Sequence, residues 1–179
     1  MAAPWPSESS TGFPGSDDGL ERLWTPHRMA YIDGNQGEPG CPFCAAPGRT
    51  DEAGLIVHRG DTCFVVLNLF PYNPGHLLVC PYRHVADYTE LTEAEVREVA
   101  DCTRRAMTVL RATAAPAGFN LGINQGAVAG AGVAGHFHQH VVPRWAGDAN
   151  FFPIIAQTKA LPQLLGDTRN RLAQAWGRP

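Results

Sequence analysis

Three histidines, His136, His138 and His140, alternate with other residues inside the stretch 135–144. In an extended strand, side chains two residues apart point to the same face and lie about 6.6 Å from one another. A neutral imidazole near pH 7 can act as a nucleophile, carry a proton or bind a metal ion. One row of imidazoles can therefore serve two neighbouring chemical sites, whereas the isolated His27 and His58 are more simply satisfied or solvent-facing side chains.

A second candidate for chemistry is the C-x-x-C pair formed by Cys41 and Cys44. Such a pair can hold zinc if two further ligands are present, or it can act as a redox couple. Residues 45–48 do not predict a helix and no β-α-β pattern surrounds the pair, which disfavours the redox interpretation. Two unpaired surface thiols remain the simple alternative. The other three cysteines lie in apolar surroundings and are expected in the core: Cys63, Cys80 and Cys102.

Composition narrows the classes of protein to which this chain can belong. It has 179 residues, of which 44% are hydrophobic, enough for one compact domain with tails. A net charge of −3 predicts no general attraction to nucleic acid or to acidic membranes, so an anionic ligand must be held by a local site. Five cysteines, an odd count, together with an N-terminus unlike a secretory signal, argue against disulfides. We expect a cytoplasmic protein with no membrane or nucleic-acid partner.

The elements that must position these residues follow from hydrophobic patterning. Residues 1–18 are rich in Ser, Pro and Gly and are predicted to form a disordered tail, which leaves 19–179 as a single domain. Apolar segments bounded by turn residues predict strands at 55–58, 63–69, 76–81 and 119–124, and the histidine stretch adds a fifth. With two main helices and no repeated β-α-β units, this pattern predicts an α+β domain on an antiparallel sheet of about five strands.

Two longer segments predict the helices. The first begins with a capping-box pattern at Thr92 and Glu95 and ends before Pro116 and Gly118. Its expected apolar face contains Val96, Val99, Ala100, Met107 and Leu110. The second helix is expected over 161–176, with Leu164, Leu165, Leu172 and Ala173 on its buried side.

The sequence H-F-H-Q-H-V-V at 136–142 resembles the signature of the histidine triad (HIT) family, and a second block supports this resemblance. Residues 68–81, N-L-F-P-Y-N-P-G-H-L-L-V-C-P, are similar to the family's ribose-binding segment. The resemblance covers roughly residues 50–152. Within the family, the words at 23–29, 68–76 and 141–151 are similar to the actinobacterial diadenosine tetraphosphate phosphorylase branch.

The resemblance implies catalysis through a nucleotidyl-histidine. By position, His138 is the nucleophile that attacks the α-phosphorus of a nucleotide, and inorganic phosphate or water then displaces it. His140, His76 and Asn124 would contact the phosphates, with backbone N–H groups of the loop 130–136 as further donors. His136 completes the expected catalytic group.

The same resemblance assigns nucleotide-binding positions. Asn68 would hydrogen-bond the ribose, and Leu67 and Leu69 would form part of a base pocket. The family's polar residue before the triad corresponds to Gly132, inside a loop of only Gly, Ala and Val at 126–135. Because that loop offers no side-chain hydrogen-bond donor, the enzyme could use a different leaving group or acceptor, or a bulkier substrate. Trp145 and the final segment would reach the partner's site in the homodimer that the resemblance implies, its two sheets joined edge to edge.

The resemblance also bears on the C-x-x-C pair. Some family members are similar to this chain in holding a structural zinc ion with C-x-x-C and two histidines, of which one follows the Val-x-Pro strand and the other is the first of the triad. The matching positions here are Cys41, Cys44, His84 and His136. Such a site, in about residues 38–50, would tie the N-terminal segment to the sheet.

Several functions remain open from sequence. The same chemistry could act on a dinucleoside polyphosphate, or on a nucleotide sugar, an adenylylated amine or a nucleotide-derived biosynthetic intermediate. A nucleotide-binding module without turnover is a further possibility, although the retained nucleophile His138 argues against it. An iron oxygenase of the cupin kind would need a carboxylate soon after His140, and residues 141–145 supply none.

Overall fold

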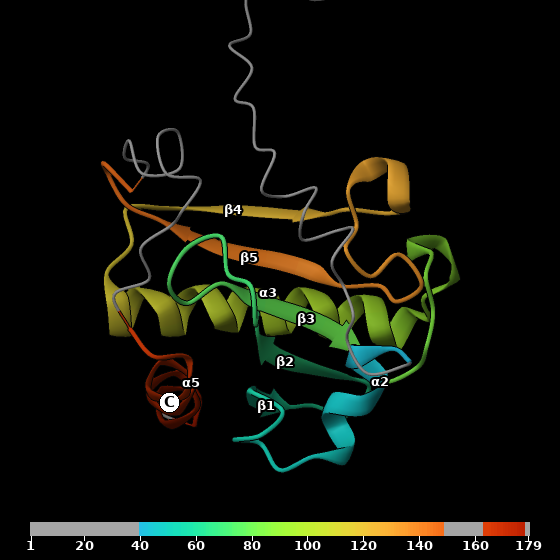
Figure 1. The fold of residues 1–179 in the computed structure, drawn as a ribbon, viewed down its shortest axis with the longest axis horizontal. Helices are drawn as coiled ribbons and strands as arrows, with labels where there is room; N and C mark the ends of the chain where they lie inside the picture. The colour runs from blue at the N-terminus through green and yellow to red at the C-terminus, as the bar shows by residue number, and fades with distance from the viewer. Residues whose placement is uncertain (1–39, 149–162, 178–179) are drawn as a thin grey trace, which may run out of the picture.

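A five-stranded antiparallel sheet forms the centre of the protein in the computed structural model, which describes residues 40–148 and 163–177 (Figure 1). The strands are β1 (Ile56–Arg59), β2 (Cys63–Leu67), β3 (Leu77–Pro81), β4 (Gly118–Ile123) and β5 (Gln139–Arg144), in the spatial order β1-β2-β3-β5-β4. The predicted α+β class and the number of strands are confirmed. The predicted disordered tail 1–18 lies outside the described residues.

Of the three inner strands, β2 and β3 are buried at every position, which explains their continuous apolar sequences. They pair in register from Cys63↔Pro81 to Leu67↔Leu77. Both are shorter than predicted: β2 ends at Leu67 and β3 begins at Leu77, while Asn68 and His76 bound the connecting loop and are joined by a hydrogen bond from Asn68 N–H to the His76 carbonyl. The three cysteines expected in the core, at positions 63, 80 and 102, are buried.

Helix α3 (Glu93–Ala114) covers one face of the sheet. The predicted capping box is present: the Thr92 hydroxyl accepts from Glu95 N–H, and the Glu95 carboxylate accepts from Thr92 N–H. The predicted apolar face is partly wrong, since Ala100 is exposed. The buried face differs because α3 packs against both the sheet and the C-terminal helix. Its buried apolar residues are Val99, Cys102, Ala106, Val109 and Leu110.

Helix α5 (Leu165–Trp176) packs against α3 and β1 on the same side of the sheet. The predicted helix was longer and included Leu164 in its buried face, but Leu164 precedes the helix and is 75% exposed. Leu172 is fully buried, and the Trp176 ring stacks on the His58 ring with centroids 4.9 Å apart. Residues 161 and 162 lie outside the described part of the chain.

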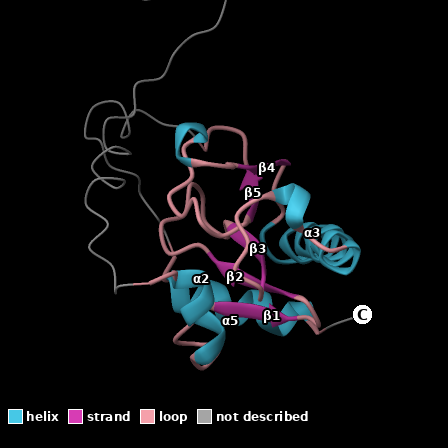
Figure 2. Ribbon diagram, turned by 90° about the vertical axis from the view of Figure 1, so that its right-hand side faces the viewer, coloured by secondary structure: helices cyan, strands magenta, loops and turns pink. Residues whose placement is uncertain are grey.

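Two hydrophobic cores lie on opposite faces of the sheet. Figure 2 shows α3 on one side of the sheet and the short helical segment 42–48 on the other. The larger core is formed with α3 and α5, and the smaller core contains Ile56, Phe64, Val66, Leu78 and Cys80. The short helix α2 (Pro42–Ala45) and the 3-10 turn η2 (Ala46–Gly48) lie against the smaller core through Phe43 and Ala46. The expectation of no helical structure at 45–48 is therefore wrong, since a 3-10 turn continues α2 there.

The histidine stretch differs from the prediction in one respect. Strand β5 begins at Gln139, so only His140 lies in the strand, while His136 and His138 lie in the extended connection before it. The reason is that β3 pairs with β5 only from Leu77↔Val141 to Val79↔Gln139. Among the described residues, no helix has the length and apolar character needed to span a membrane.

Candidate functional site

The three triad histidines share one face of the sheet even though only one of them is in a strand. Phe137 is buried in the core beneath α3, and the Gln139 side chain donates to Thr103 Oγ1 on α3 over 2.8 Å. These two residues therefore point toward α3. His136, His138 and His140 alternate with them and point away, which confirms the predicted alternation.

His140 and His76 form a hydrogen-bonded pair, with His76 Nε2 and His140 Nδ1 2.9 Å apart. The Tyr72 backbone N–H donates to His76 Nδ1 over 3.1 Å, and Asn68 Nδ2 lies 3.2 Å from the same atom. Since Nδ1 of His76 accepts, its neutral ring carries the proton on Nε2 and donates to His140. His140 in turn keeps its own proton on Nε2. Asn68, His76 and His140 thus form a chain of hydrogen bonds whose donors all point toward His140, which we call the relay.

The β2–β3 loop, which carries Asn68 and His76 of the relay, also contributes Tyr72, to which the sequence assigned no role of its own. The Tyr72 ring stacks on His140 with centroids 5.7 Å apart and an interplanar angle of 11°, and it contacts His76 at 4.7 Å. Asn68 Oδ1 accepts from Phe70 N–H, which fixes the orientation of the Asn68 amide. The sequence signal that could have identified Tyr72 is its position as an aromatic residue in the block 68–81, which also contains His76.

His138 is held with a defined tautomer. Its Nδ1 lies 2.8 Å from the His136 backbone oxygen, and because a carbonyl can only accept, Nδ1 carries the proton. Nε2 therefore keeps its lone pair. Burial lowers the pKa of His138, whose exposed fraction is 5%, so the ring is neutral near pH 7. A neutral imidazole with a fixed tautomer has the properties of a nucleophile.

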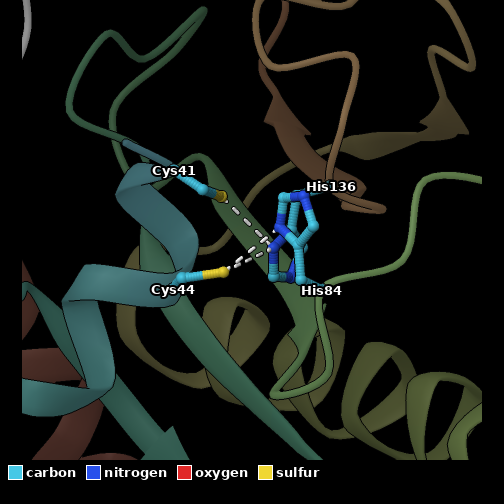
Figure 3. A group of neighbouring side chains, drawn as sticks. All are labelled: Cys41, Cys44, His84 and His136. Carbon is cyan, nitrogen blue, oxygen red and sulfur yellow. Dashed lines mark hydrogen bonds between the residues drawn. The ribbon is translucent and has the colours of Figure 1, made fainter. Parts of the chain in front are cut away.

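Four side chains converge beside the triad, as the C-x-x-C pair and two histidines predicted (Figure 3). The ligand atoms of Cys41, Cys44, His84 and His136 all lie within 4.8 Å of one another. His136 Nδ1 lies 3.3 Å from Cys41 Sγ and 3.5 Å from Cys44 Sγ, and His84 Nδ1 lies 3.2 Å from Cys44 Sγ. Tetrahedral zinc with ordinary Zn–S and Zn–N bonds separates neighbouring ligands by roughly 3.5 Å. Two thiols and two imidazoles at these spacings fit a divalent zinc ion.

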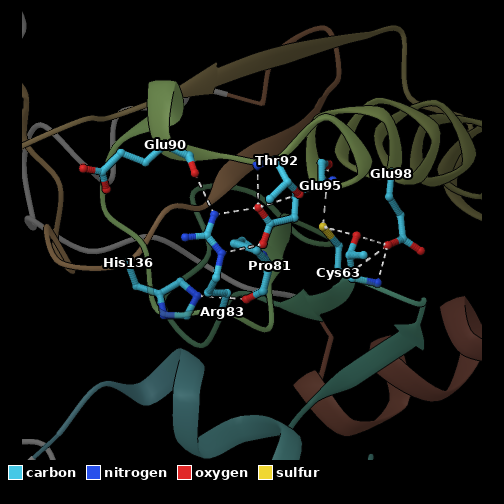
Figure 4. A network of polar contacts seen from close by, with 9 residues as sticks. Cys63, Pro81, Arg83, Glu90, Thr92, Glu95, Glu98 and His136 are labelled. Atoms are coloured by element: carbon cyan, nitrogen blue, oxygen red, sulfur yellow. Dashed lines mark hydrogen bonds and ion pairs between the residues drawn. The ribbon is translucent and has the colours of Figure 1, made fainter.

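Backbone and charged groups orient the histidines of this cluster (Figure 4). His136 Nε2 donates to the Pro81 carbonyl over 2.9 Å, which leaves Nδ1 as the atom facing the thiols. Arg83 binds the Glu95 carboxylate through two nitrogens, at 3.1 and 2.8 Å, and also donates to the Glu90 carbonyl. The start of α3 thereby fixes the segment 81–84, which supplies both His84 and the acceptor for His136.

The other residues predicted to bind the nucleotide do not all lie on the face of the sheet that carries the triad. Asn124 is half-buried and follows Ile123, the partner of Gln139, at the end of β4. Gly132 is exposed in the loop that precedes the triad. Leu69 is 58% exposed just beyond β2, whereas Leu67 is buried in the core beneath α3. Leu67 therefore cannot line a pocket on the histidine face.

Trp145 lies at the opposite end of β5 from His138, and its indole N–H donates to the Ala114 carbonyl at the end of α3. Within one chain the structure does not bring Trp145 to the triad. A groove of about 410 Å³ also lies away from the triad, on the α3 side of the sheet, and its walls include Tyr88, Met107, Arg111 and Gln139.

Comparisons with known proteins agree with this geometry. Over 172 residues the chain is 48% identical to a Mycobacterium tuberculosis (strain ATCC 25618 / H37Rv) protein named AP-4-A phosphorylase, covering 92% of this chain and 88% of that protein. It is 32% identical over 93 residues to a Schizosaccharomyces pombe bis(5'-nucleosyl)-tetraphosphatase, covering 52% of this chain and 50% of that protein.

A solved structure and a family model match as well. The crystal structure of a zinc-bound histidine triad family protein from Mycobacterium smegmatis superposes with a TM-score of 0.62 at 27% identity, covering 78% of this chain and 95% of that one. The family model described as HIT domain matches residues 49–147, more than half of the chain. The chain belongs to the HIT domain family.

Proposed function

We propose that this protein is a nucleotidyl-transferring enzyme that cleaves diadenosine tetraphosphate by phosphorolysis. The observation that carries the proposal is His138, a buried neutral imidazole whose Nδ1–H is held by the His136 carbonyl and whose Nε2 keeps its lone pair. The name of the Mycobacterium tuberculosis relative, AP-4-A phosphorylase, supports this choice of substrate and acceptor.

In the proposed reaction, His138 Nε2 attacks the α-phosphorus of the dinucleotide. A bond forms between nitrogen and phosphorus, the bond from phosphorus to the bridging oxygen breaks, and ATP leaves. An oxygen of inorganic phosphate then attacks the same phosphorus and releases ADP, which restores the free imidazole. Positioning and relief of negative charge are the main requirements of such a transfer.

The relay would supply part of that charge relief. His140 holds its proton on Nε2 because His76 donates to its other nitrogen, so it presents a donor to the phosphates or to the leaving oxygen. We assign phosphate contacts to His140, His76 and Asn124, and to backbone N–H groups near Gly132. Asn68 is proposed to bind the ribose, and the exposed Leu69 the base.

We further propose that Cys41, Cys44, His84 and His136 hold a structural zinc ion. When bound, zinc would neutralise the two thiolates and tie α2 to the sheet, with no direct part in the transfer. Replacing Cys44 with Ser is expected to lower zinc content and thermal stability together. Cys102→Ala, which changes a thiol in the core beneath α3, is the control and should keep its zinc. Unchanged zinc in C44S would contradict the assignment.

A second candidate function is the same transfer from a different substrate, such as a nucleotide sugar or an adenylylated amine. The observation that favours it is the loop 126–135, which offers no side-chain donor for a polyphosphate leaving group. If diadenosine tetraphosphate is the substrate, only backbone N–H groups of this loop can donate hydrogen bonds to the polyphosphate leaving group.

The deciding experiment is incubation of the purified protein with diadenosine tetraphosphate, with and without inorganic phosphate, followed by separation of the nucleotides. ADP and ATP formed only with phosphate would support phosphorolysis, and AMP formed without phosphate would indicate hydrolysis. His138→Ala is the control and should form neither. No turnover by a wild-type protein that still binds AMP would shift the proposal to the second candidate.

A homodimer is proposed through the edge strand β4. Leu121 and Ile123 are 48% and 36% exposed there, and both pair with residues that face α3, so they lie on the same side of the sheet as the α3 groove. A second copy would cover this apolar edge and bring its Trp145 closer to the site.

We also propose a cytoplasmic location. All five cysteines are free in the structure, and a zinc site at Cys41 and Cys44 needs reduced thiols, which a reducing compartment maintains.

A further inference from the structure

We propose that Phe43 is a positioning residue for His138, and that metal binding at the Cys41/Cys44/His84/His136 cluster holds Phe43 in place. Metal binding would thus help to set the orientation of the His138 ring, although the metal site and the nucleophile are separate sites. This inference rests on the proposed function in taking His138 as the nucleophile.

Direct contacts place Phe43 between the two sites. It is one of the two residues between Cys41 and Cys44, so its backbone is fixed wherever both thiols are fixed. Its ring centroid lies 5.0 Å from that of His138 with an interplanar angle of 41°, and 5.5 Å from that of His136 in an edge contact at 68°. The ring is half-buried against the smaller core. It therefore limits the rotation of the His138 imidazole from one side.

His136 provides a second connection through its backbone. Its side chain belongs to the metal cluster, with Nδ1 toward the thiols and Nε2 donating to Pro81. Its carbonyl accepts the Nδ1 proton of His138 over 2.8 Å. A backbone displacement at residue 136 that withdrew its ring from the thiols would also move this carbonyl. Both the ring wall and the tautomer-fixing acceptor of His138 therefore depend on residues of the cluster.

The helix that carries Phe43 has little stability of its own. Helix α2 has four residues, no side-chain N-cap bond and no buried residue, and a single helical turn is unstable by itself in water. Its hold on the body of the protein comes from the two thiols and from Phe43 and Ala46 against the smaller core. A metal ion shared with His84 and His136 would add the constraint that keeps Phe43 against His138.

In-line attack on phosphorus makes this constraint matter for rate. His138 Nε2 must point at the α-phosphorus, and a displacement of about 1 Å can lower a rate by about 10²-fold. A wall that restricts the imidazole raises the fraction of molecules ready to react. Its loss should therefore lower kcat more than it raises KM.

The first test uses Phe43 variants of the full-length, zinc-loaded protein in the diadenosine tetraphosphate assay. We expect F43A to lower kcat by about tenfold, with a smaller change in KM and an unchanged zinc content. Phe43→Tyr keeps the ring and should recover most of the rate. Leu55→Ala removes a partly buried side chain from the same smaller core without touching His138, and should leave kcat unchanged. A rise in KM alone for F43A, or a loss in L55A equal to that in F43A, would overturn the proposal.

The second test needs neither substrate nor turnover, so it separates this proposal from the proposed function. Imidazole NMR of the zinc-loaded protein should show a protected Nδ1–H of His138, identified by its absence in H138A. Removing zinc with a chelator should expose or broaden this signal, adding Zn²⁺ should restore it, and F43A should broaden it even with zinc bound. The proposal would be overturned if the His138 signal of the zinc-free protein and that of zinc-loaded F43A both matched the signal of the zinc-loaded wild-type protein, even if the enzymatic activity is as proposed.

Discussion

Proton positions in the relay follow from one backbone donor. Because Tyr72 N–H donates to His76 Nδ1, the neutral His76 ring must carry its proton on Nε2, and His140 must accept at Nδ1. Two histidines at hydrogen-bonding distance would be ambiguous without that donor. The loop geometry therefore decides the chemistry of His140.

We expect His76→Ala to lower kcat/KM for diadenosine tetraphosphate by about 10²-fold, because His140 loses the donor that fixes its tautomer. Zinc content should not change, since His76 is not part of the cysteine–histidine cluster. His58→Ala is the matched control, because His58 stacks on Trp176 and should leave activity unchanged. Full activity in H76A would show that His140 works without this donor.

The Glu95 carboxylate gives a prediction for acid stability. Hydrogen bonds from Arg83 lower the pKa of Glu95 from 4.5 to about 2 in the folded protein. A lowered folded-state pKa stabilises the fold above the unfolded pKa, and this contribution is lost as the pH falls from about 4.5 to about 2.

Glu95→Gln should therefore lower the free energy of unfolding by about 2 kcal/mol at pH 7, less than the full linkage value because Arg83 is half-exposed. Gln can keep the capping box, so the substitution tests the charge. The difference between the two proteins should shrink below pH 4.5, as measured by urea unfolding at several pH values. Glu93→Gln, an exposed change in the same turn, serves as the control. A difference that stays constant with pH would refute the linkage.

At the scale of elements, α3 ends at an unfavourable residue. Ala115 occupies the left-handed C-cap position with φ 43° and ψ 52°, where glycine has no steric penalty. The helix ends there because the chain must turn into β4 within a few residues.

Ala115→Gly is expected to raise the free energy of unfolding by about 0.5–1 kcal/mol, since it removes the strain of the left-handed conformation. The exposed Ala112→Gly, three residues earlier inside α3, should lower it by about 1 kcal/mol. Thermal and urea unfolding of both variants measure this contrast. If both changes were destabilising, the left-handed cap would not be a source of strain.

For the whole molecule, the sheet separates two kinds of surface. One face carries the relay, His138 and the cysteine–histidine cluster, while the other carries α3, α5 and the larger core. The edge strand β4 borders both faces: Leu121, the partner of Val141, lies on the α3 side, and Asn124 follows the strand directly after Ile123.

The proposed dimer makes a prediction for this edge. Leu121→Asp should place a charge in the interface and shift the protein toward the monomer, as measured by sedimentation velocity. Leu164→Asp, at a more exposed apolar position before α5, should leave the assembly unchanged. A wild-type protein that is already monomeric at micromolar concentration would exclude the interface.

The sequence by itself determined the features that depend on local spacing. The alternation of His136, His138 and His140 assigned them one face, and the capping box at Thr92 placed the start of α3. The resemblance to the HIT family, through the C-x-x-C motif and two matching histidine positions, also predicted the group of Cys41, Cys44, His84 and His136. The histidine alternation and the capping box depend on residues only two to three positions apart, and the cysteine–histidine group depends on a recognisable motif. None of these inferences needs the packing of the chain.

Only the tertiary structure decided how these parts meet. Strand β5 begins at Gln139 because its pairing with β3 ends there, which releases His136 to reach thiols more than 90 residues away in the chain. The exposed faces of Ala100 and Leu164 depend on how α3 and α5 pack together, which helical periodicity does not specify. The tautomer of His136 is set by the Pro81 carbonyl, 55 residues away in the chain, whereas those of His76 and His138 are set by backbone groups two to four residues away whose positions depend on the folded loops. A side chain's type fixes what it can donate or accept, but its partners come from packing.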